Sequence, residues 1–267
     1  PLSSFKSKSG ADINLYGFVR GDANYIIEGQ DDDFNKVASS DGKTKDKLRA
    51  TAKTTRLGLD FNTNVGGDNK LGGKVEVDFA GSTTDSNGAL RIRHAYLTYN
   101  NWLFGQTTSN FLSNHAPEMI DFATNVGGGT AARIPQVRYG FNLAPATKLF
   151  ISAEEGDSSG KNIKYSVPNL TAKLTQGFAD GKGSVSARAL VENYKSADDS
   201  DTAWGLAAGV NYQVMDRLKI SADVSYVDGN SNYLYGSNSS YVVNAANGKI
   251  AQNEAFGVQV GGTYKFN

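Results

Sequence analysis

The sequence predicts an all-β fold in which antiparallel strands close into a transmembrane β-barrel of roughly 12–16 strands. The first observation is that polar and apolar residues alternate in many segments, as in Arg56–Asn62 and Lys74–Phe79. A period of two indicates strands with one apolar and one polar face. The second observation is that no segment approaches the roughly 18 consecutive apolar residues of a membrane helix. Such strands suit a barrel with lipid outside and water inside.

The composition narrows the possible functions. The 27 basic and 27 acidic residues cancel, so nothing favours binding to nucleic acid. The chain contains 30 Gly, 13 Tyr and 13 Phe, which suits strands, turns and the aromatic belts of membrane barrels. No cofactor is expected, and Gly127–Gly129 is not a phosphate loop, since no Lys-Ser or Lys-Thr follows it. Since the chain begins at Pro1 without a charged and apolar leader, we expect that any export signal has been removed.

The alternating segments predict a polar N-terminal tail at residues 1–12 and a barrel at residues 13–267. Long polar connections are predicted at residues 28–53, 107–132 and 228–253. The number of predicted strands is odd, whereas single-chain bacterial barrels have an even number. Either one strand between about residues 171 and 211 is misassigned, or residues are missing from the sequence. The predicted strands are Ile13–Ile27, Thr54–Asn62, Gly73–Ala80, Ala89–Tyr99, Asn101–Gln106, Ile134–Asn142, Thr147–Glu154, Lys161–Val167, Thr171–Ala179, Ser184–Asn193, Thr202–Gln213, Arg217–Val227 and Glu254–Phe266.

Several short motifs follow one another along the first half of the chain. They are Leu15-Tyr16-Gly17, Arg56-Leu57-Gly58, Arg93-His94-Ala95-Tyr96, Phe104-Gly105-Gln106, Pro117-Glu118 and Ala132-Arg133. Together they resemble Gram-negative trimeric outer-membrane porins, and most of all the DcaP-like channels associated with dicarboxylates and aromatic acids. This resemblance implies a homotrimer in contact with outer-membrane lipid and lipopolysaccharide, with an inward-folded third loop at residues 107–133. DcaP-like proteins are longer and carry a periplasmic N-terminal extension, so we expect this sequence to be a shortened form.

Strand parity predicts arginines on the water-facing wall. If Leu57 and Leu59 face lipid, then Arg56 faces the lumen. The resemblance to porins places Arg133 on the same wall, opposite the third loop. Guanidinium groups in a narrow aqueous passage attract anions, and their planar forks match carboxylate oxygens. The same alternation sends other arginines to this wall: Arg91 and Arg93 opposite in parity to Ile92, Arg138 between Val137 and Tyr139, and Arg20 in parity with Asn14 and Asn24.

The third loop is predicted to carry less negative charge than in similar porins. Those proteins often hold two acidic residues four positions apart, whereas here the later position is Glu118 and the earlier one is Asn114. Asp121 lies one helical turn further on and restores part of that charge. Lumen-facing Glu76 and Asp78 act in the same direction. We therefore predict a channel that prefers small anionic solutes, with dicarboxylates favoured, and that is lined by these loop residues and the wall arginines.

Two other functions fit the same features. A general cation-preferring or non-selective porin would share the fold, and a soluble all-β binding protein would pack its apolar face on a second sheet. An enzyme is not expected, because neither of the two His residues has the nucleophile and orienting acid of a triad. His94 has the parity of Ile92, so it is predicted on the lipid-facing side, at a subunit interface or aromatic belt. The run Asp31-Asp32-Asp33 is interpreted as solvated, with no metal site.

Overall fold

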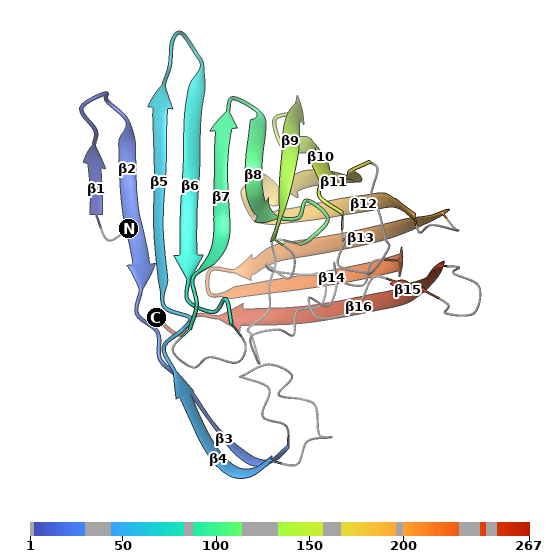
Figure 1. Cartoon of the computed structure of the whole chain (residues 1–267). Coiled ribbons are helices and arrows are strands. Elements are labelled where there is room, and N and C mark those ends of the chain that lie inside the picture. The colour runs from blue at the N-terminus through green and yellow to red at the C-terminus, as the bar shows by residue number, and fades with distance from the viewer. Residues whose placement is uncertain are drawn as a thin grey trace. The chain divides into compact units, whose positions relative to one another are not determined.

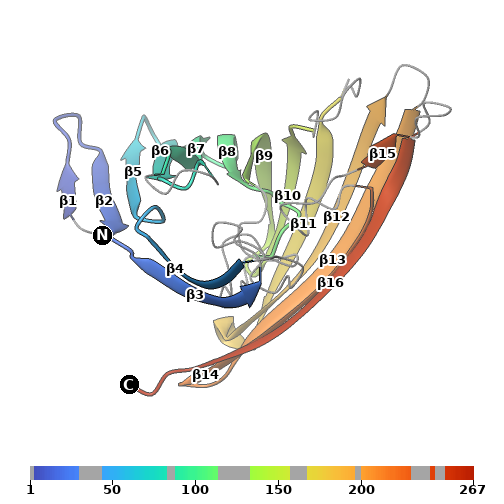
Figure 2. The ribbon, with the colours of Figure 1, turned by 60° about the horizontal axis from the view of Figure 1, so that its bottom comes forward.

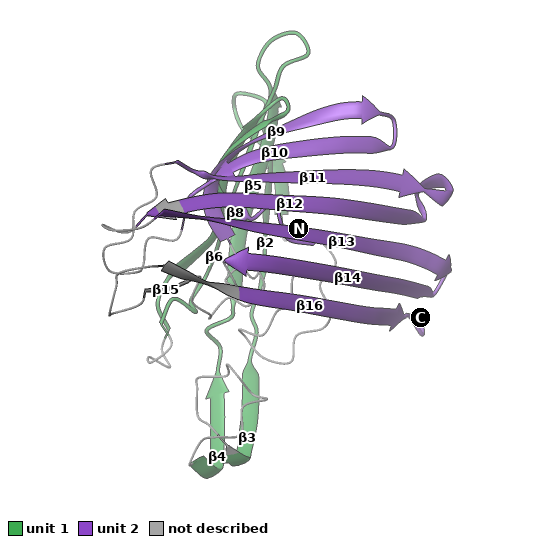
Figure 3. Cartoon of the chain, turned by 90° about the vertical axis from the view of Figure 1, so that its right-hand side faces the viewer, with its two compact units in different colours: residues 1–107, 120–124 green, residues 108–119, 125–267 purple. Residues whose placement is uncertain are grey.

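The computed structural model describes residues 3–29, 44–82, 88–113, 133–156, 167–195, 200–229, 241–243 and 250–267. These residues form strands and their connections, with one short 3₁₀ turn at Ala179–Gly181 (Figure 1). They fall into two compact units, residues 1–107 with 120–124 and residues 108–119 with 125–267 (Figure 3). Within the described ranges, no helix has the length and apolarity needed to cross a membrane.

Unit 1 contains an antiparallel sheet in the order β1-β2-β5-β6-β7-β8. Tight turns join several of these strands, and β7 reverses into β8 through Asn100. The φ of Asn100 is 51°, a left-handed conformation that Asn adopts more readily than most residues. The strands are β1 (Ser3–Lys6), β2 (Asp12–Phe18), β5 (Arg56–Asn64), β6 (Lys70–Asp78), β7 (Arg91–Tyr99) and β8 (Trp102–Thr108).

A separate hairpin of β3 (Asp22–Gly29) and β4 (Thr44–Thr51) extends beyond the ends of β2 and β5 (Figure 1). The sequence predicts one strand at residues 13–27 and a loop at residues 28–53. The break between β2 and β3, and the presence of β4, therefore correct this prediction. Most of β4 is exposed on both faces, so it lacks the apolar alternation by which strands are recognised.

The polar segment at residues 1–12 contains a strand where a tail is predicted. In β1, Phe5 lies opposite Ile13 of β2, and Ser4 donates from its hydroxyl to Asn14 at 2.7 Å. The main-chain N–H and C=O groups of this polar segment form hydrogen bonds with β2, so it becomes a strand although it has no apolar face. The three strands predicted between residues 171 and 211 are all present, so no misassignment lies there. The strand predicted at residues 161–167 falls almost entirely outside the described residues.

Unit 2 is an antiparallel sheet in the order β9-β10-β11-β12-β13-β14-β16-β15. Figure 2 shows its long strands lying side by side. Their boundaries agree with the sequence prediction most closely at β10, where the two coincide. The strands are β9 (Arg133–Ala144), β10 (Thr147–Glu154), β11 (Asn169–Phe178), β12 (Gly183–Lys195), β13 (Ser200–Met215), β14 (Leu218–Gly229), β15 (Tyr241–Val243) and β16 (Ile250–Tyr264).

Each sheet buries polar residues and exposes apolar ones, which is the reverse of a soluble protein. In unit 1, Glu76 is buried while its neighbour Val75 is exposed. In unit 2, Arg188 and Glu154 are buried while Val260 is exposed. We call the side with the buried polar residues the polar face of each sheet, and the opposite side its apolar face. This distribution is the one expected for strands between water and lipid.

A β-bulge in β7 changes which residues reach the polar face of unit 1. Glu76 of β6 pairs with His94, but the next residue, Val77, pairs with Ile92. Arg93 is therefore the extra residue of the bulge, and the alternation restarts after it. Arg93 and His94 both lie on the polar face as a result, so the prediction that His94 faces lipid is wrong. Parity inferred from Ile92 does not continue past a bulge.

Candidate functional site

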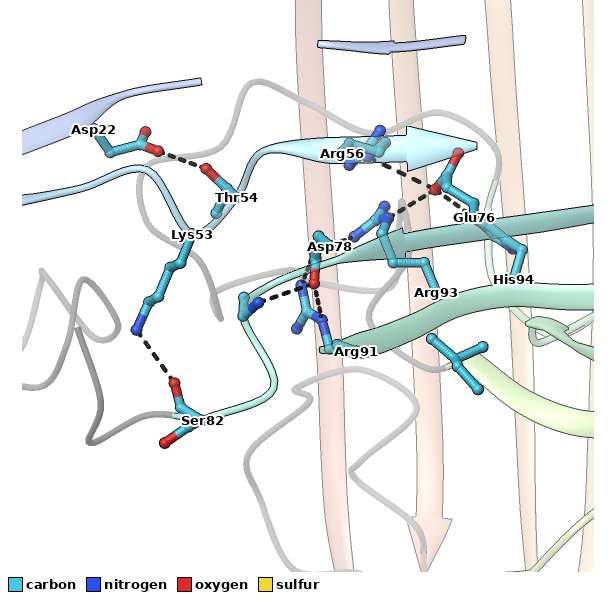
Figure 4. A network of polar contacts seen from close by, with 12 residues as sticks. Asp22, Lys53, Thr54, Arg56, Glu76, Asp78, Ser82, Arg91, Arg93 and His94 are labelled. Carbon is cyan, nitrogen blue, oxygen red and sulfur yellow. Dashed lines mark hydrogen bonds and ion pairs between the residues drawn. The ribbon is translucent and has the colours of Figure 1, made fainter. Parts of the chain in front are cut away.

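Two carboxylates and three arginines meet on the polar face of unit 1 (Figure 4). Glu76 and Asp78 lie two positions apart on β6, so the pleat directs both side chains to the same face. The register places Asp78 between Arg56 of β5 and Arg91 of β7, and the bulge adds Arg93. We call these five residues the arginine cluster. Three adjacent strands contribute to it, although its members span positions 56 to 93.

Each arginine of the cluster is held differently. Arg91 binds Asp78 with two parallel bonds, Nε to Oδ1 at 2.9 Å and Nη2 to Oδ2 at 2.6 Å. Arg93 donates from Nε to Oε2 of Glu76 at 2.7 Å, and its Nη1 lies 3.5 Å from Oδ2 of Asp78. Nε of Arg56 lies 3.7 Å from Oε2 of Glu76, which is too long for a hydrogen bond.

Arg56 has donor capacity left in this arrangement. Its Nε has no hydrogen-bond partner among the described atoms, and its guanidinium lies 5.0 Å from the centre of the Phe18 ring. An arginine on an aromatic face is oriented by a cation–π contact that does not use its N–H groups. The exposed N–H groups of this guanidinium can therefore donate to a further anionic partner.

Within the arginine cluster, Glu76, Asp78 and Arg93 are buried, whereas Arg56 and Arg91 are more exposed. The side chains of Glu76 and Asp78 are 8% and 2% exposed, whereas those of Arg56 and Arg91 are 30% and 36% exposed. Counting formal charges, three guanidinium groups against two carboxylates leave one positive charge. A molecule that approaches this face from water therefore meets guanidinium groups first. Such an arrangement attracts anions and can bind carboxylate oxygens.

Tyr16 completes the surroundings of Glu76 from two strands away. Its hydroxyl donates to Oε1 of Glu76 at 2.7 Å, and the register places Gly58 of β5 between the two residues. A Cβ atom at Gly58 would overlap the ring of Tyr16. Because Gly58 has no side chain, the Tyr16 ring can cross β5 and reach the carboxylate. Tyr16 and Gly58 belong to motifs noted in the sequence, but this contact was not predicted.

Arg20 forms its own ion pair at the end of β2. Its Nε and Nη2 lie 3.0 and 2.9 Å from Oδ1 of Asp22. The hydroxyl of Thr54 donates to the other oxygen of Asp22 at 2.6 Å. Nearby, the buried Lys53 donates to the main-chain carbonyl of Ser82 at 3.3 Å (Figure 4). Arg20 is thus placed at the junction with the β3–β4 hairpin, and its contact with solutes stays a prediction.

The polar face of unit 2 holds the segment that follows β8. Arg138 donates from Nη2 to the carbonyl of Thr108 at 2.8 Å. Lys173 of β11 donates to the carbonyl of Leu112 at 2.9 Å, and Nε of Arg188 donates to that of Phe111 at 2.7 Å. These cations are thus bonded to the main chain at the start of the predicted third loop. Arg138 was predicted on this face, whereas Lys173 and Arg188 were missed.

Two further contacts fix the same segment, residues 108–113. The buried carboxylate of Glu154 accepts from the Ser109 hydroxyl at 2.6 Å and from the Asn110 main-chain N–H at 2.9 Å. Phe111 and Leu112 then pack in a buried apolar cluster with Leu190 and Val227. We call residues 108–113 the anchored segment. It is held by charge-assisted hydrogen bonds and by apolar packing on one polar face.

Four of the predicted site residues need separate mention. Arg133 is the first residue of β9 and is half-buried. Asn114, Glu118 and Asp121 lie outside the described residues. The proposed roles of all four therefore stay predictions. Among the described residues, no group of three or more His, Cys, Asp or Glu side chains is arranged to hold a metal ion.

Comparison with known proteins identifies the family. The family model of the DcaP outer membrane protein matches residues 3–267. The chain belongs to the DcaP outer membrane protein family. The chain is 70% identical to the outer membrane channel DcaP of Acinetobacter baumannii, with a TM-score of 0.90. The match covers 99% of this chain and 77% of that channel. No protein among the curated sequences matches it.

A more distant structure supports the fold alone. The OmpF complex with daunomycin from Salmonella typhi matches 99% of this chain and 77% of the other, at 15% identity and a TM-score of 0.62. The DcaP assignment confirms the predicted outer-membrane location and the porin resemblance. It also confirms that the chain is a channel protein and not an enzyme. The soluble binding protein considered from the sequence is thereby excluded.

Proposed function

We propose that the chain forms a closed β-barrel through which small anionic solutes diffuse, with dicarboxylates favoured. The observation that carries this proposal is the burial pattern of the arginine cluster. Its carboxylates lie beneath, while Arg56 and Arg91 remain about one-third exposed. An anion that enters would exchange part of its hydration for N–H donors, and shared weak contacts would allow it to leave.

The constriction is proposed to lie between this wall and the third loop at residues 107–133. Arg20, Arg133 and Arg138 extend the wall, and Asn114, Glu118 and Asp121 contribute from the loop. Support comes from the anchored segment, since three of its carbonyls accept bonds from cations on the polar face of unit 2. We further propose a homotrimer whose apolar faces contact lipid and lipopolysaccharide. The trimer rests on the porin resemblance and is tested by the mass of the detergent-solubilised assembly.

The selectivity is tested by the reversal potential of single channels in a planar bilayer under a potassium chloride gradient. Wild-type protein is expected to prefer chloride, and Arg56→Gln to lower the chloride-to-potassium permeability ratio by about twofold, as expected for one charge near the ion path. Lys182→Gln removes a charge from an exposed turn and serves as the matched control. If the wild type prefers cations, the chain is still a channel, but the proposal that its solutes are anions is rejected.

The dicarboxylate preference needs its own measurement. A four-carbon dicarboxylate added to one side should reduce the chloride current of the wild type, since two carboxylates can engage Arg56 and Arg91 together. Its monocarboxylate counterpart at equal concentration should reduce it less. Equal effects of the two acids would contradict the dicarboxylate preference and leave the anion preference standing.

A further inference from the structure

His94 is the one described side chain on the polar face of unit 1 that ordinarily changes charge between pH 5 and 8. The bulge at Arg93 brings it there, and its Nε2 lies 3.7 Å from Oε2 of Glu76. The imidazole is 15% exposed, so it is in contact with water and protons can reach it. Its position next to an ion-paired carboxylate gives its charge a direct influence on the cluster.

Oε2 of Glu76 already has close basic neighbours. Nε of Arg93 donates to it at 2.7 Å, and Nε of Arg56 lies 3.7 Å away. The other oxygen, Oε1, accepts from Tyr16. A protonated His94 would therefore be one more cation near a carboxylate whose two oxygens both have donors. Counting formal charges, four cations would then face the two carboxylates, and the excess positive charge would rise from one to two.

The other ring nitrogen of His94 accommodates both charge states. Nδ1 lies 2.9 Å from the hydroxyl oxygen of Thr107 on β8. A hydroxyl can donate to the neutral imidazole or accept from the protonated one. Protonation therefore requires no movement of the ring away from Glu76. Protonation of His94 therefore adds a positive charge to the polar face without moving the ring.

We propose that His94 is a specificity-determining residue, and that its protonation increases the preference of the channel for anions. This inference rests on the proposed function, because it assumes that the arginine cluster lines the ion path. The other titratable or charged side chains on the strands around His94 are Tyr16 on β2, Arg56 and Asp60 on β5, Lys74, Glu76 and Asp78 on β6, and Arg91, Arg93 and Tyr96 on β7. None of these residue types ordinarily changes charge between pH 5.5 and 8.

The test is the reversal potential at pH 8 and pH 5.5 for the wild type and His94→Gln. A unit charge roughly 8 Å from a permeating ion, in a water-like dielectric, raises the anion concentration and lowers the cation concentration about twofold each, and salt screening reduces the combined effect to about twofold. We therefore expect the chloride-to-potassium permeability ratio of the wild type to rise about twofold on acidification. His94→Gln keeps a hydrogen-bonding group beside Thr107 and should show no such rise.

A second variant keeps the inference testable if His94→Gln does not fold. His94→Lys should show the higher ratio at both pH values, because its charge persists across this range. A pH response of equal size in His94→Gln would overturn the inference, as would a wild-type ratio that does not change. Cation preference at both pH values would reject the proposed function. The change in the permeability ratio between pH 8 and pH 5.5 would still test the role of His94, whichever ion is preferred.

Discussion

Arg188 on the polar face of unit 2 and Arg56 and Arg91 on that of unit 1 lie in opposite environments. In unit 2, the side chain of Arg188 is 0% exposed and bonds to Asp223, Ser186 and the carbonyl of Phe111. In unit 1, Arg56 and Arg91 are about one-third exposed over buried carboxylates. An arginine on the polar face is therefore not by itself a contact for solutes. Whether its donors are already used by the protein decides between a structural and a solute-binding role.

The largest effect on stability is expected from Arg188→Met. This change leaves Asp223 buried without its cation and the Phe111 carbonyl without its donor. Breaking a buried pair in this way costs about 3–5 kcal/mol. Urea unfolding of the detergent-folded protein, followed by its heat-dependent gel migration, measures the loss. The double variant Arg188→Met with Asp223→Leu should recover much of it, because no unpaired charge remains. If Arg188→Met unfolds at the same urea concentration as the wild type, Arg188 has no structural role that distinguishes it from Arg56 and Arg91.

An intermediate effect is expected from Gly58→Ala in unit 1. The new Cβ would meet the Tyr16 ring, so Tyr16 must leave Glu76 or the strand must shift, at a cost of about 1–3 kcal/mol. The same unfolding measurement applies. Combining it with Tyr16→Ala should cost less than the two single changes added together, since the ring that clashes is gone. Strict additivity would show that the ring does not pass over Gly58.

The smallest effect on stability is expected from Arg91→Gln. Arg91 is partly solvated, and the buried Asp78 keeps Arg93 and the main-chain N–H of Ala80 as partners, so losing this ion pair should cost about 1 kcal/mol. Added salt should reduce that contribution, and unfolding at low and high ionic strength measures it. Arg188→Gln is the matched comparison. If the two substitutions cost the same, exposure does not distinguish the arginines of the two polar faces.

Much of the strand pattern follows from the sequence because apolar and polar residues alternate where one face meets lipid. Leu57, Val137 and Ile92 are exposed on the apolar faces as parity predicts, and Arg56 lies on the polar face. Strand β4 of the hairpin was missed because most of it is exposed on both faces, so no apolar period marks it. Polar and apolar residues alternate along a strand only when its two faces meet different environments, and they do not alternate where both faces meet water.

The candidate site was only partly predictable for a different reason. Parity assigns Lys173 and Arg188 to a polar face, because both alternate with exposed or half-buried apolar neighbours. Their partners, Leu112 and Phe111, lie 61 and 77 positions earlier in the chain. Local sequence pattern carries no information about which distant carbonyl a side chain reaches. His94 was misplaced because Arg93 and His94 are both polar, so the bulge left no break in hydropathy.

The β7 bulge also sets how closely ionisable groups can follow one another along that strand. A regular strand turns one side chain toward a given face about every 6.6–6.8 Å. At the bulge, two consecutive residues, Arg93 and His94, share one face within the length that elsewhere carries one. The extra residue of the bulge therefore doubles the number of ionisable side chains that this length of strand presents to the polar face. Deleting Arg93 would convert the bulge into regular pairing, leaving His94 as the one ionisable side chain there and the following residues on the faces they now occupy.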